Sequence, residues 1–496
     1  MKADKLFELI KRMTKQEKIF FQRFAQLSTN NKDKRYLQLF RAIEKQTKRQ
    51  QKIDSTSLKK DFKYLSADKG YLMQNLLKAL AFFYEEERPK EQVKAWIRQI
   101  HVLKDKELIP AAQQLIRKAA QIAKEYNLWM DLVALKNIEI SLIEPDAVGL
   151  VRLEILIQKK QAILRQEANY DEYIVLHYQI MHWQAQYYFV DTEEKEQKFE
   201  ALENSELLGS IDKAISTFAI NQFYFSKNMV LFLKRDFEAW NKKYQEYMAF
   251  REGKMHLFGG YNEVVLYSNY LLSCIKVRDK VEFWKSIQKL ETFQNLPALE
   301  AYTFFVLAVR KLEFYSSIGA FEKNRQWIEV VEEQLKGYQN RLDIKQKEFL
   351  YALLGRAYIE LEDYKTALKW LSKLYKAAGF APITALYLSV RLQIMICYYE
   401  LNWWSNLESE LRAVYRVLRQ QKLQFDFYLV LMRFFQQVVK AVDVTAYKNA
   451  LLDLKKAWEK LLPNPKENGP FEFFHYIPWL ESKLQNQKLS ECIKLK

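Results

Sequence analysis

The chain has 496 residues, of which 49% are hydrophobic and 15% aromatic, so it is too apolar for a disordered protein and long enough to bury a large core. Only 11 glycines and 9 prolines are present. Because sheet proteins use these residues in their many turns, the composition argues against a β fold and predicts an all-α protein with short connections. The formal net charge is +17, which points to anionic partners if the cations gather in one place.

Residues 1–88 are predicted to form a basic N-terminal helical domain. Thr14 and Glu17 have the spacing of a capping box at a helix start, and Asp54 fits the N-cap of a later helix. Residues 1–69 contain 19 Lys/Arg and 8 Asp/Glu, a net charge of +11, against +6 for the other 427 residues. Residues 58–80 fit two helices joined by a polar turn at 66–70. We interpret this pair as ordinary packing, with a DNA-reading helix-turn-helix as the alternative.

A basic stripe is expected on the helix predicted over residues 32–52. At about 100° per residue, five cations fall on one face, and four apolar side chains (Tyr36, Leu39, Phe40 and Ile43) centre on the opposite face. The stripe is either a solvated face or an anion-binding surface for nucleic acid, an acidic protein or a lipid headgroup. Its members are Lys34, Arg41, Lys45, Lys48 and Lys52.

Residues 89–205 are predicted to be irregular helical hairpins. Apolar periodicity and helix-start residues place helices over 92–106, 110–126, 128–142, 145–167 and 171–190, followed by an acidic helix or linker over 191–206. Trp129 and Tyr170 are 41 residues apart and are candidates for early copies of the repeat described next.

Residues 206–462 carry a repeating signature. Tyr364-Lys-Thr-Ala-Leu returns as Tyr447-Lys-Asn-Ala-Leu, with weaker copies between and before them. The markers at 237, 281, 321, 364, 404 and 447 are separated by 44, 40, 43, 40 and 43 residues. A fixed period of this size predicts stacked helical hairpins, because the apolar face of each hairpin can be buried only by its neighbours.

The best-defined repeat spans residues 351–371. Gly355, Tyr358, Tyr364 and Ala367 stand where two helices approach closely and turn. This pattern resembles the tetratricopeptide repeat (TPR), which has a Leu-Gly pair, a Tyr three residues later, an Asp-Tyr at the turn and a small Ala in its second helix. The period of 40–44 exceeds the standard length of about 34. The resemblance therefore implies a TPR-like, right-handed α-solenoid with longer helices or wider connections.

The resemblance also implies a binding groove. In TPR proteins the first helix of each hairpin lines the concave surface, which places seven residues of this chain in a partner-binding groove. The groove lining mixes apolar, polar and charged residues, so a protein segment with apolar anchors is the expected partner. The Lys/Asn set with which some TPR proteins hold a terminal carboxylate is not present. The seven groove residues are Asn269, Lys276, Phe349, Arg356, Glu360, Tyr399 and Glu400.

The C-terminal residues 463–496 are predicted to be a Pro-rich break followed by a capping helix. Pro463, Pro465 and Pro470 end the array. A helix over 471–496 then carries aromatic side chains that are expected to cover the exposed end of the stack, because a terminal repeat needs a cap.

No catalytic, metal-binding or cofactor-binding constellation is found in the sequence. His177 and His182 are five residues apart rather than the four of a helical zinc pair, and Gly259-Gly260 lacks the Lys-Ser/Thr of a phosphate loop. We therefore predict a non-enzymatic protein–protein interaction scaffold or adaptor. The alternatives are a nucleic-acid- or ribosome-associated protein that uses the basic stripe, and a ligand-sensing TPR-type regulator.

A cytoplasmic location is expected. Cys274, Cys397 and Cys492 are widely separated, which is typical of reduced thiols. The N-terminus lacks the apolar stretch of a secretory signal, and uncharged stretches fall short of the roughly 20 residues of a transmembrane segment.

Overall fold

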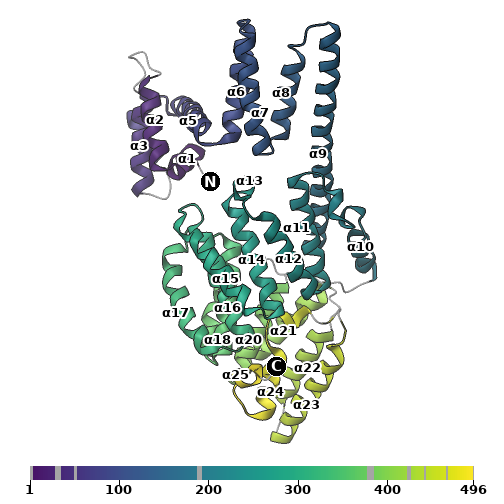
Figure 1. Cartoon of the computed structure of the whole chain (residues 1–496). Helices are drawn as coiled ribbons and strands as arrows, with labels where there is room; N and C mark the ends of the chain where they lie inside the picture. Colours follow the sequence, from purple (N-terminus) through teal and green to yellow (C-terminus); the bar gives the residue numbers. More distant parts are fainter. Residues whose placement is uncertain are drawn as a thin grey trace. The chain divides into compact units, whose positions relative to one another are not determined.

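The structure is a computed structural model that describes residues 4–27, 35–49, 53–186, 193–376, 385–421, 426–440, 443–464, 467 and 469–494. These residues form helices and turns, with no β-strand among them. Their contacts divide the chain into two compact units, Met1–Ala168 and Asn169–Lys496, whose helices are labelled in Figure 1. In the described part, no helix is long and apolar enough to cross a membrane.

The first five helices share one apolar core. Asp4 caps the first by accepting from the N–H groups of Leu6 and Phe7, both at 3.1 Å. The predicted capping box is confirmed, because the Glu17 N–H donates to Thr14 Oγ1 at 3.2 Å and the Thr14 N–H donates to Glu17 Oε2 at 2.5 Å. The helices are α1 (Lys5–Arg12), α2 (Lys15–Leu27), α3 (Arg35–Arg49), α4 (Ser55–Asp61) and α5 (Leu65–Glu87).

Helix α3 has the two faces predicted from sequence. Tyr36, Leu39, Phe40 and Ile43 are buried, whereas Arg41 and Lys45 of the basic stripe are exposed. Two further members of the stripe, Lys34 and Lys52, lie outside the described residues. Lys48 belongs to α3, but its side chain is not described.

The prediction of a turn at residues 66–70 is wrong. Helix α4 ends at Asp61 and α5 begins at Leu65, so the turn lies at residues 62–64. Phe62 is buried there and anchors the chain in the core. Gly70, the last residue of the predicted turn, lies inside α5. A Cβ at this position would meet open space. An isolated glycine is tolerated in a helix.

Four more helices complete the first unit and lead into the second. They are α6 (Pro89–Asp105), α7 (Ile109–Glu125), α8 (Trp129–Ile140) and α9 (Ala147–Gln186). The prediction that a helix ends near residues 167–171 is wrong, because α9 continues through these residues. Residues 150–186 contain neither glycine nor proline, so nothing breaks the helix. The side chain of Asn169 instead bonds outward, donating to the Lys213 carbonyl and accepting from the Ile215 N–H, both at 3.0 Å.

The second unit begins with short elements and continues as regular hairpins. The hairpins stack as an α-solenoid in which the consecutive first helices α14, α16, α18 and α20 contact one another. The elements are α10 (Glu193–Glu203), η1 (Glu206–Leu208), η2 (Ile211–Lys213), α11 (Thr217–Lys234), α12 (Phe237–Arg251), α13 (Met255–Phe258), α14 (Gly260–Val277), α15 (Lys280–Glu291), η3 (Thr292–Asn295), α16 (Glu300–Ser317), α17 (Phe321–Tyr338), α18 (Ile344–Glu360), α19 (Tyr364–Lys376), α20 (Ala385–Glu400), α21 (Trp404–Gln421), α22 (Asp426–Lys440) and α23 (Val444–Leu461).

The sequence markers stand at the starts of the second helices. Phe237, Phe321, Tyr364 and Trp404 are the first residues of α12, α17, α19 and α21. The markers at 281 and 447 follow the starts of α15 and α23 by one and three residues. The predicted period is therefore confirmed, and its origin is the turn between the two helices of each hairpin.

That turn has one repeated backbone geometry. A residue with positive φ follows the first helix, and the second helix begins two positions later. A left-handed residue ends a helix by satisfying its last carbonyl groups. Glycine takes this position only once among the seven such turns in the described part of the chain, which hides the motif from sequence inspection. The residues are Glu107, Asn127, Arg235, Arg278, Gly319, Glu362 and Asn402, with φ between 52° and 64°.

The chain ends in helices that return to the solenoid. The prediction of a single helix over residues 471–496 is wrong. The segment consists of η4 (Gly469–Glu472), α24 (Tyr476–Gln485) and α25 (Leu489–Lys494). Asn486 adopts φ 54° and ends α24. The last two helices are yellow in Figure 1.

Gly355 provides a test of the close packing between α18 and α19. A Cβ at this position would overlap the side chain of Leu371. We predict that Gly355→Ala destabilises the second unit by about 1–3 kcal/mol, measured as the midpoint of urea unfolding. The control is Gly337→Ala on the exposed face of α17, where a Cβ meets open space. This change should be neutral or stabilise by up to about 1 kcal/mol. Equal effects of the two substitutions would contradict the close approach.

Candidate functional site

The C-terminal segment, residues 469–494, lies along the first helices of the hairpins. We call the surface of α14, α16, α18 and α20 that faces this segment the inner wall. The segment contacts the wall through charged groups near Glu472, a polar cluster at His475 and an aromatic anchor at Trp479. The wall therefore holds a polypeptide, and that polypeptide belongs to the same chain.

Glu472 is held at one end of the wall by two cations. The Lys276 ammonium of α14 is 3.3 Å from its carboxylate, and the Arg235 guanidinium at the end of α11 is 3.4 Å away. All three side chains are about one quarter exposed. Partial burial reduces solvent screening, so these pairs orient the segment more strongly than exposed pairs would.

His475 joins a buried polar cluster between α16 and α18. Glu360, only 3% exposed, accepts at Oε1 from Ser316 Oγ at 2.6 Å and from Arg356 Nε at 2.9 Å. The Ser316 oxygen also lies 3.2 Å from His475 Nε2. Because the single hydroxyl hydrogen of Ser316 is directed at Glu360, the imidazole must be the donor to Ser316. This arrangement requires a hydrogen on Nε2.

The neutral state of His475 is favoured by its surroundings. Burial lowers the pKa of His475 from 6.5 to about 4, the nearby Arg356 cation also lowers it, and Glu360 opposes the shift without overcoming it. A charged imidazole would lose hydration and gain only one carboxylate at 3.7 Å. Docking of the segment therefore favours a neutral histidine.

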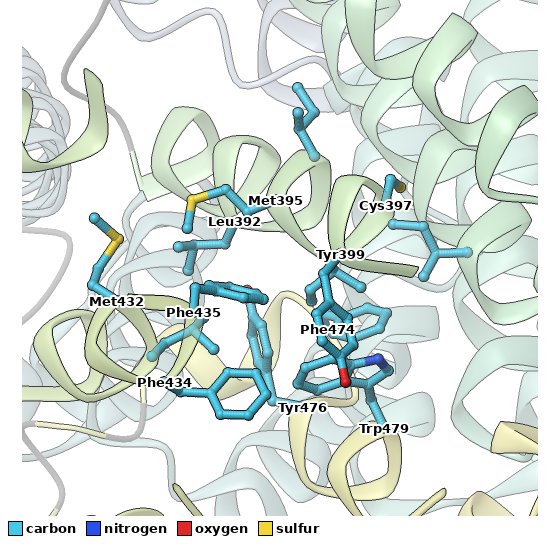
Figure 2. Close-up of a cluster of buried hydrophobic side chains, with 14 of the residues drawn as sticks. Leu392, Met395, Cys397, Tyr399, Met432, Phe434, Phe435, Phe474, Tyr476 and Trp479 are labelled. Carbon is cyan, nitrogen blue, oxygen red and sulfur yellow. The ribbon is translucent and has the colours of Figure 1, made fainter. Parts of the chain in front are cut away.

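Trp479 anchors the segment at the aromatic end of the wall. Its side chain is 1% exposed, and its indole N–H donates to Glu400 Oε1 of α20 at 2.7 Å. Lys483 donates to the other Glu400 oxygen, also at 2.7 Å. The indole meets Tyr399 edge-on, with ring centroids 5.8 Å apart. Figure 2 shows Tyr399, Phe434 and Phe435 gathered beside Tyr476 and Trp479.

A cavity of about 460 Å³ remains open beside Glu472. Four cations line it, Arg235, Lys276, Arg278 and Arg356, against the carboxylates of Glu313 and Glu472. Apolar walls come from α14 and from Phe471 of the segment. The cavity thus combines a surplus of positive charge with apolar surface, which suits an anionic group on a partly apolar molecule.

Five of the seven predicted groove residues meet at the inner wall. Lys276, Glu360, Tyr399 and Glu400 contact the C-terminal segment, and Arg356 lines the cavity. The other two lie elsewhere. Asn269 hydrogen-bonds Tyr244 of α12, and Phe349 packs into the apolar cluster of α16, α17 and α18.

Sequence reasoning missed the occupant of the wall. Glu472, His475, Trp479 and Lys483 are spaced by 3, 4 and 4 residues, which places them on one face of a helical segment. This spacing was a usable signal, but an aromatic helix after the last repeat also fits a simple end cap. Arg235 was missed as well, since it lies in the turn of its hairpin.

The hairpins, their repeated turn and the stacked first helices define a TPR-like helical repeat protein. No protein-family model matches the chain, and no curated protein matches it. Solved structures that match the chain at low similarity include the following two. NprR in complex with its cognate peptide NprX shares 13% identity at a TM-score of 0.42, over 75% of this chain and 96% of that chain. A Rap protein complexed with Competence and Sporulation Factor shares 12% identity at a TM-score of 0.39, over 81% of this chain and 99% of that chain.

The lowered pKa of His475 predicts that acid loosens the C-terminal segment. Between pH 6.5 and about 4 the detached segment binds a proton that the docked segment does not. The contribution of His475 to the free energy of docking is therefore fully present above pH 6.5. Docking becomes weaker by at most about 3 kcal/mol as the pH falls to 4. The measurement is amide hydrogen exchange in residues 469–494, corrected for the intrinsic effect of pH. His475→Gln should flatten the pH dependence, and an unchanged slope in this variant would exclude His475 as the cause.

Proposed function

We propose that the protein is a non-enzymatic adaptor that binds a segment of a partner protein at the inner wall, next to its own C-terminal segment. The observation that carries the proposal is the occupancy of the wall by residues 469–494. Helices α14, α16, α18 and α20 hold this polypeptide by an acid, a histidine, a tryptophan and a lysine in succession. A surface that recognises one such segment has the chemistry to recognise another.

The cavity beside Glu472 is the part of the wall that a partner can enter without displacing the C-terminal segment. Its four cations exceed its two carboxylates. We therefore propose that the partner places an acidic residue there, next to Arg278, while an apolar side chain covers Phe471. Electrostatic complementarity of this kind sets orientation and specificity. We also propose a cytoplasmic location, which is supported by the three cysteines being free thiols.

A second candidate function is sensing of a small anionic ligand in the same cavity. It is supported by the cavity volume of about 460 Å³, which falls in the range of small-molecule sites. A dicarboxylate such as succinate, titrated against the full chain, should then raise the unfolding temperature in proportion to the logarithm of its concentration. No shift at millimolar concentrations would leave the adaptor as the better proposal.

Site-specific photo-crosslinking in cells that make the protein tests the adaptor. A photoreactive residue at Ser317, in the cavity lining, should capture a discrete partner protein. The same residue at Glu333, on the exposed face of α17, should not. Arg278→Glu should reduce capture at Ser317 by about 10-fold, which corresponds to about 1.4 kcal/mol of binding free energy. The matched reversal Lys323→Glu on α17 should leave it unchanged.

The same species captured at both positions, or capture that is insensitive to Arg278→Glu, would contradict the proposed location of the partner. Unfolding temperatures of the four variants show whether a loss of capture reflects a loss of folding. Arg278 and Lys323 are both exposed, so their reversal should not affect the core.

A further inference from the structure

A basic hollow lies in the N-terminal unit between α3, the end of α4 and the start of α5. Its volume is about 1230 Å³, and Arg35, Lys59, Lys60 and Lys63 line it with a single carboxylate, Asp61. This hollow is separate in sequence from the inner wall, and no part of the proposed adaptor function uses it.

The lysines of the hollow have no carboxylate partner among the described residues. Arg35 pairs with Asp68 at 3.3 Å, but Lys59, Lys60 and Lys63 form no ion pair with any residue that the structure describes. All three lysines are exposed. Cations crowded into a hollow repel one another, and a bound anion would relieve the repulsion. Because the charges are spread over several residues, a ligand with several anionic groups fits better than a single ion.

The basic surface continues from the hollow along α3. Gln38 lines the hollow. Arg41 and Lys45 follow it by three and seven residues, so they lie on the same face of the helix, and both are exposed. These two members of the stripe predicted from sequence thus extend the hollow into a longer positive track. A track suits a chain of phosphates.

Tyr64 adds an aromatic ring to this track. It lines the hollow and is 61% exposed, and the Lys63 ammonium lies 5.6 Å from its ring centroid. An exposed ring among cations is the arrangement on which single-stranded nucleic acids stack their bases. A lipid surface would require apolar side chains to insert, whereas Leu65, the other large apolar residue of the lining, is buried.

We infer that the basic hollow and the exposed face of α3 bind single-stranded nucleic acid. Lys59, Lys60 and Lys63 contact phosphates in the hollow, and a base stacks on Tyr64. Duplex recognition fits less well, because a helix that enters the major groove needs free cations near its start. The first two turns of α5 contain one lysine, Lys69, which is tied to Asp4 at 2.6 Å.

Fluorescence anisotropy with the full chain and labelled oligonucleotides of about 12 nucleotides tests the inference. Oligo-dT and oligo-U should bind more tightly than a duplex of the same length. The triple variant Lys59→Glu/Lys60→Glu/Lys63→Glu should weaken binding at least about 10-fold. It should also reduce the slope of log affinity against log salt by about 2, since each single-strand phosphate contact contributes about 0.7.

The charge-matched control is Lys90→Glu/Lys106→Glu/Lys159→Glu, which reverses three lysines of the same unit outside the hollow. It should change affinity less than about 3-fold, because these charges act only at long range. Tyr64→Ala should weaken binding about 5-fold or more without changing the salt slope, and Tyr64→Phe should retain it, since stacking needs the ring and not the hydroxyl.

Three outcomes would overturn the inference. The first is an absence of oligonucleotide binding at about 50 mM salt. The second is equal weakening by the two triple variants, which would mean that only net charge matters. The third is binding to vesicles that contain phosphatidylserine, or to the duplex, more tightly than to the single strands. Near-native circular dichroism of each variant makes the comparison valid, because every substituted side chain is exposed.

Discussion

The solenoid depends on one constraint. The first helix of each hairpin must be buried on nearly every side. Helix α20 shows it most clearly, since Leu388, Val390, Leu392, Met395 and Ile396 are all buried although they point in different directions around the helix. Neighbouring hairpins cover two sides of such a helix, and its own second helix covers another. The remaining side is covered by the C-terminal segment, whose Tyr476, Trp479 and Leu480 join the same apolar cluster. A helix with apolar side chains on several sides requires burial of each of those sides.

The C-terminal segment consequently has two roles. Its aromatic residues complete the core of the last hairpins, and its charged residues extend along the wall as far as Lys276 of α14. The polar contacts supply donors to one oxygen of the buried Glu360 carboxylate. Glu360 is almost fully buried, and its Oε1 receives both Ser316 and Arg356. A buried carboxylate without such donors would be strongly destabilising, so the cluster restricts which residues the wall accepts.

The candidate binding surfaces of the two units differ in burial and charge. The wall of the second unit combines buried aromatic anchors with paired charges, which suits a folded or extended polypeptide. The basic hollow of the first unit is open, with exposed lysines and an exposed tyrosine, which suits a flexible polyanion. Burial lowers the pKa of His475 in the C-terminal segment to about 4, and burial raises the pKa of Cys274 in α14 to about 12.

The sequence by itself determined the helical class and the period of the hairpins, and it singled out five residues that the structure places at the inner wall. These properties follow from local rules: Phe237, Tyr364 and Trp404 recur because each begins a helix after the same turn, and a spacing of four places Arg356 and Glu360 on one face of α18. Only the tertiary structure decided what lies on that face. The contact between Lys276 and Glu472 joins residues 196 positions apart, and no local pattern encodes such a pairing. The continuity of α9 through residues 167–171 follows from a segment without glycine or proline, but the tertiary structure alone showed that Asn169 bonds to Lys213 and Ile215.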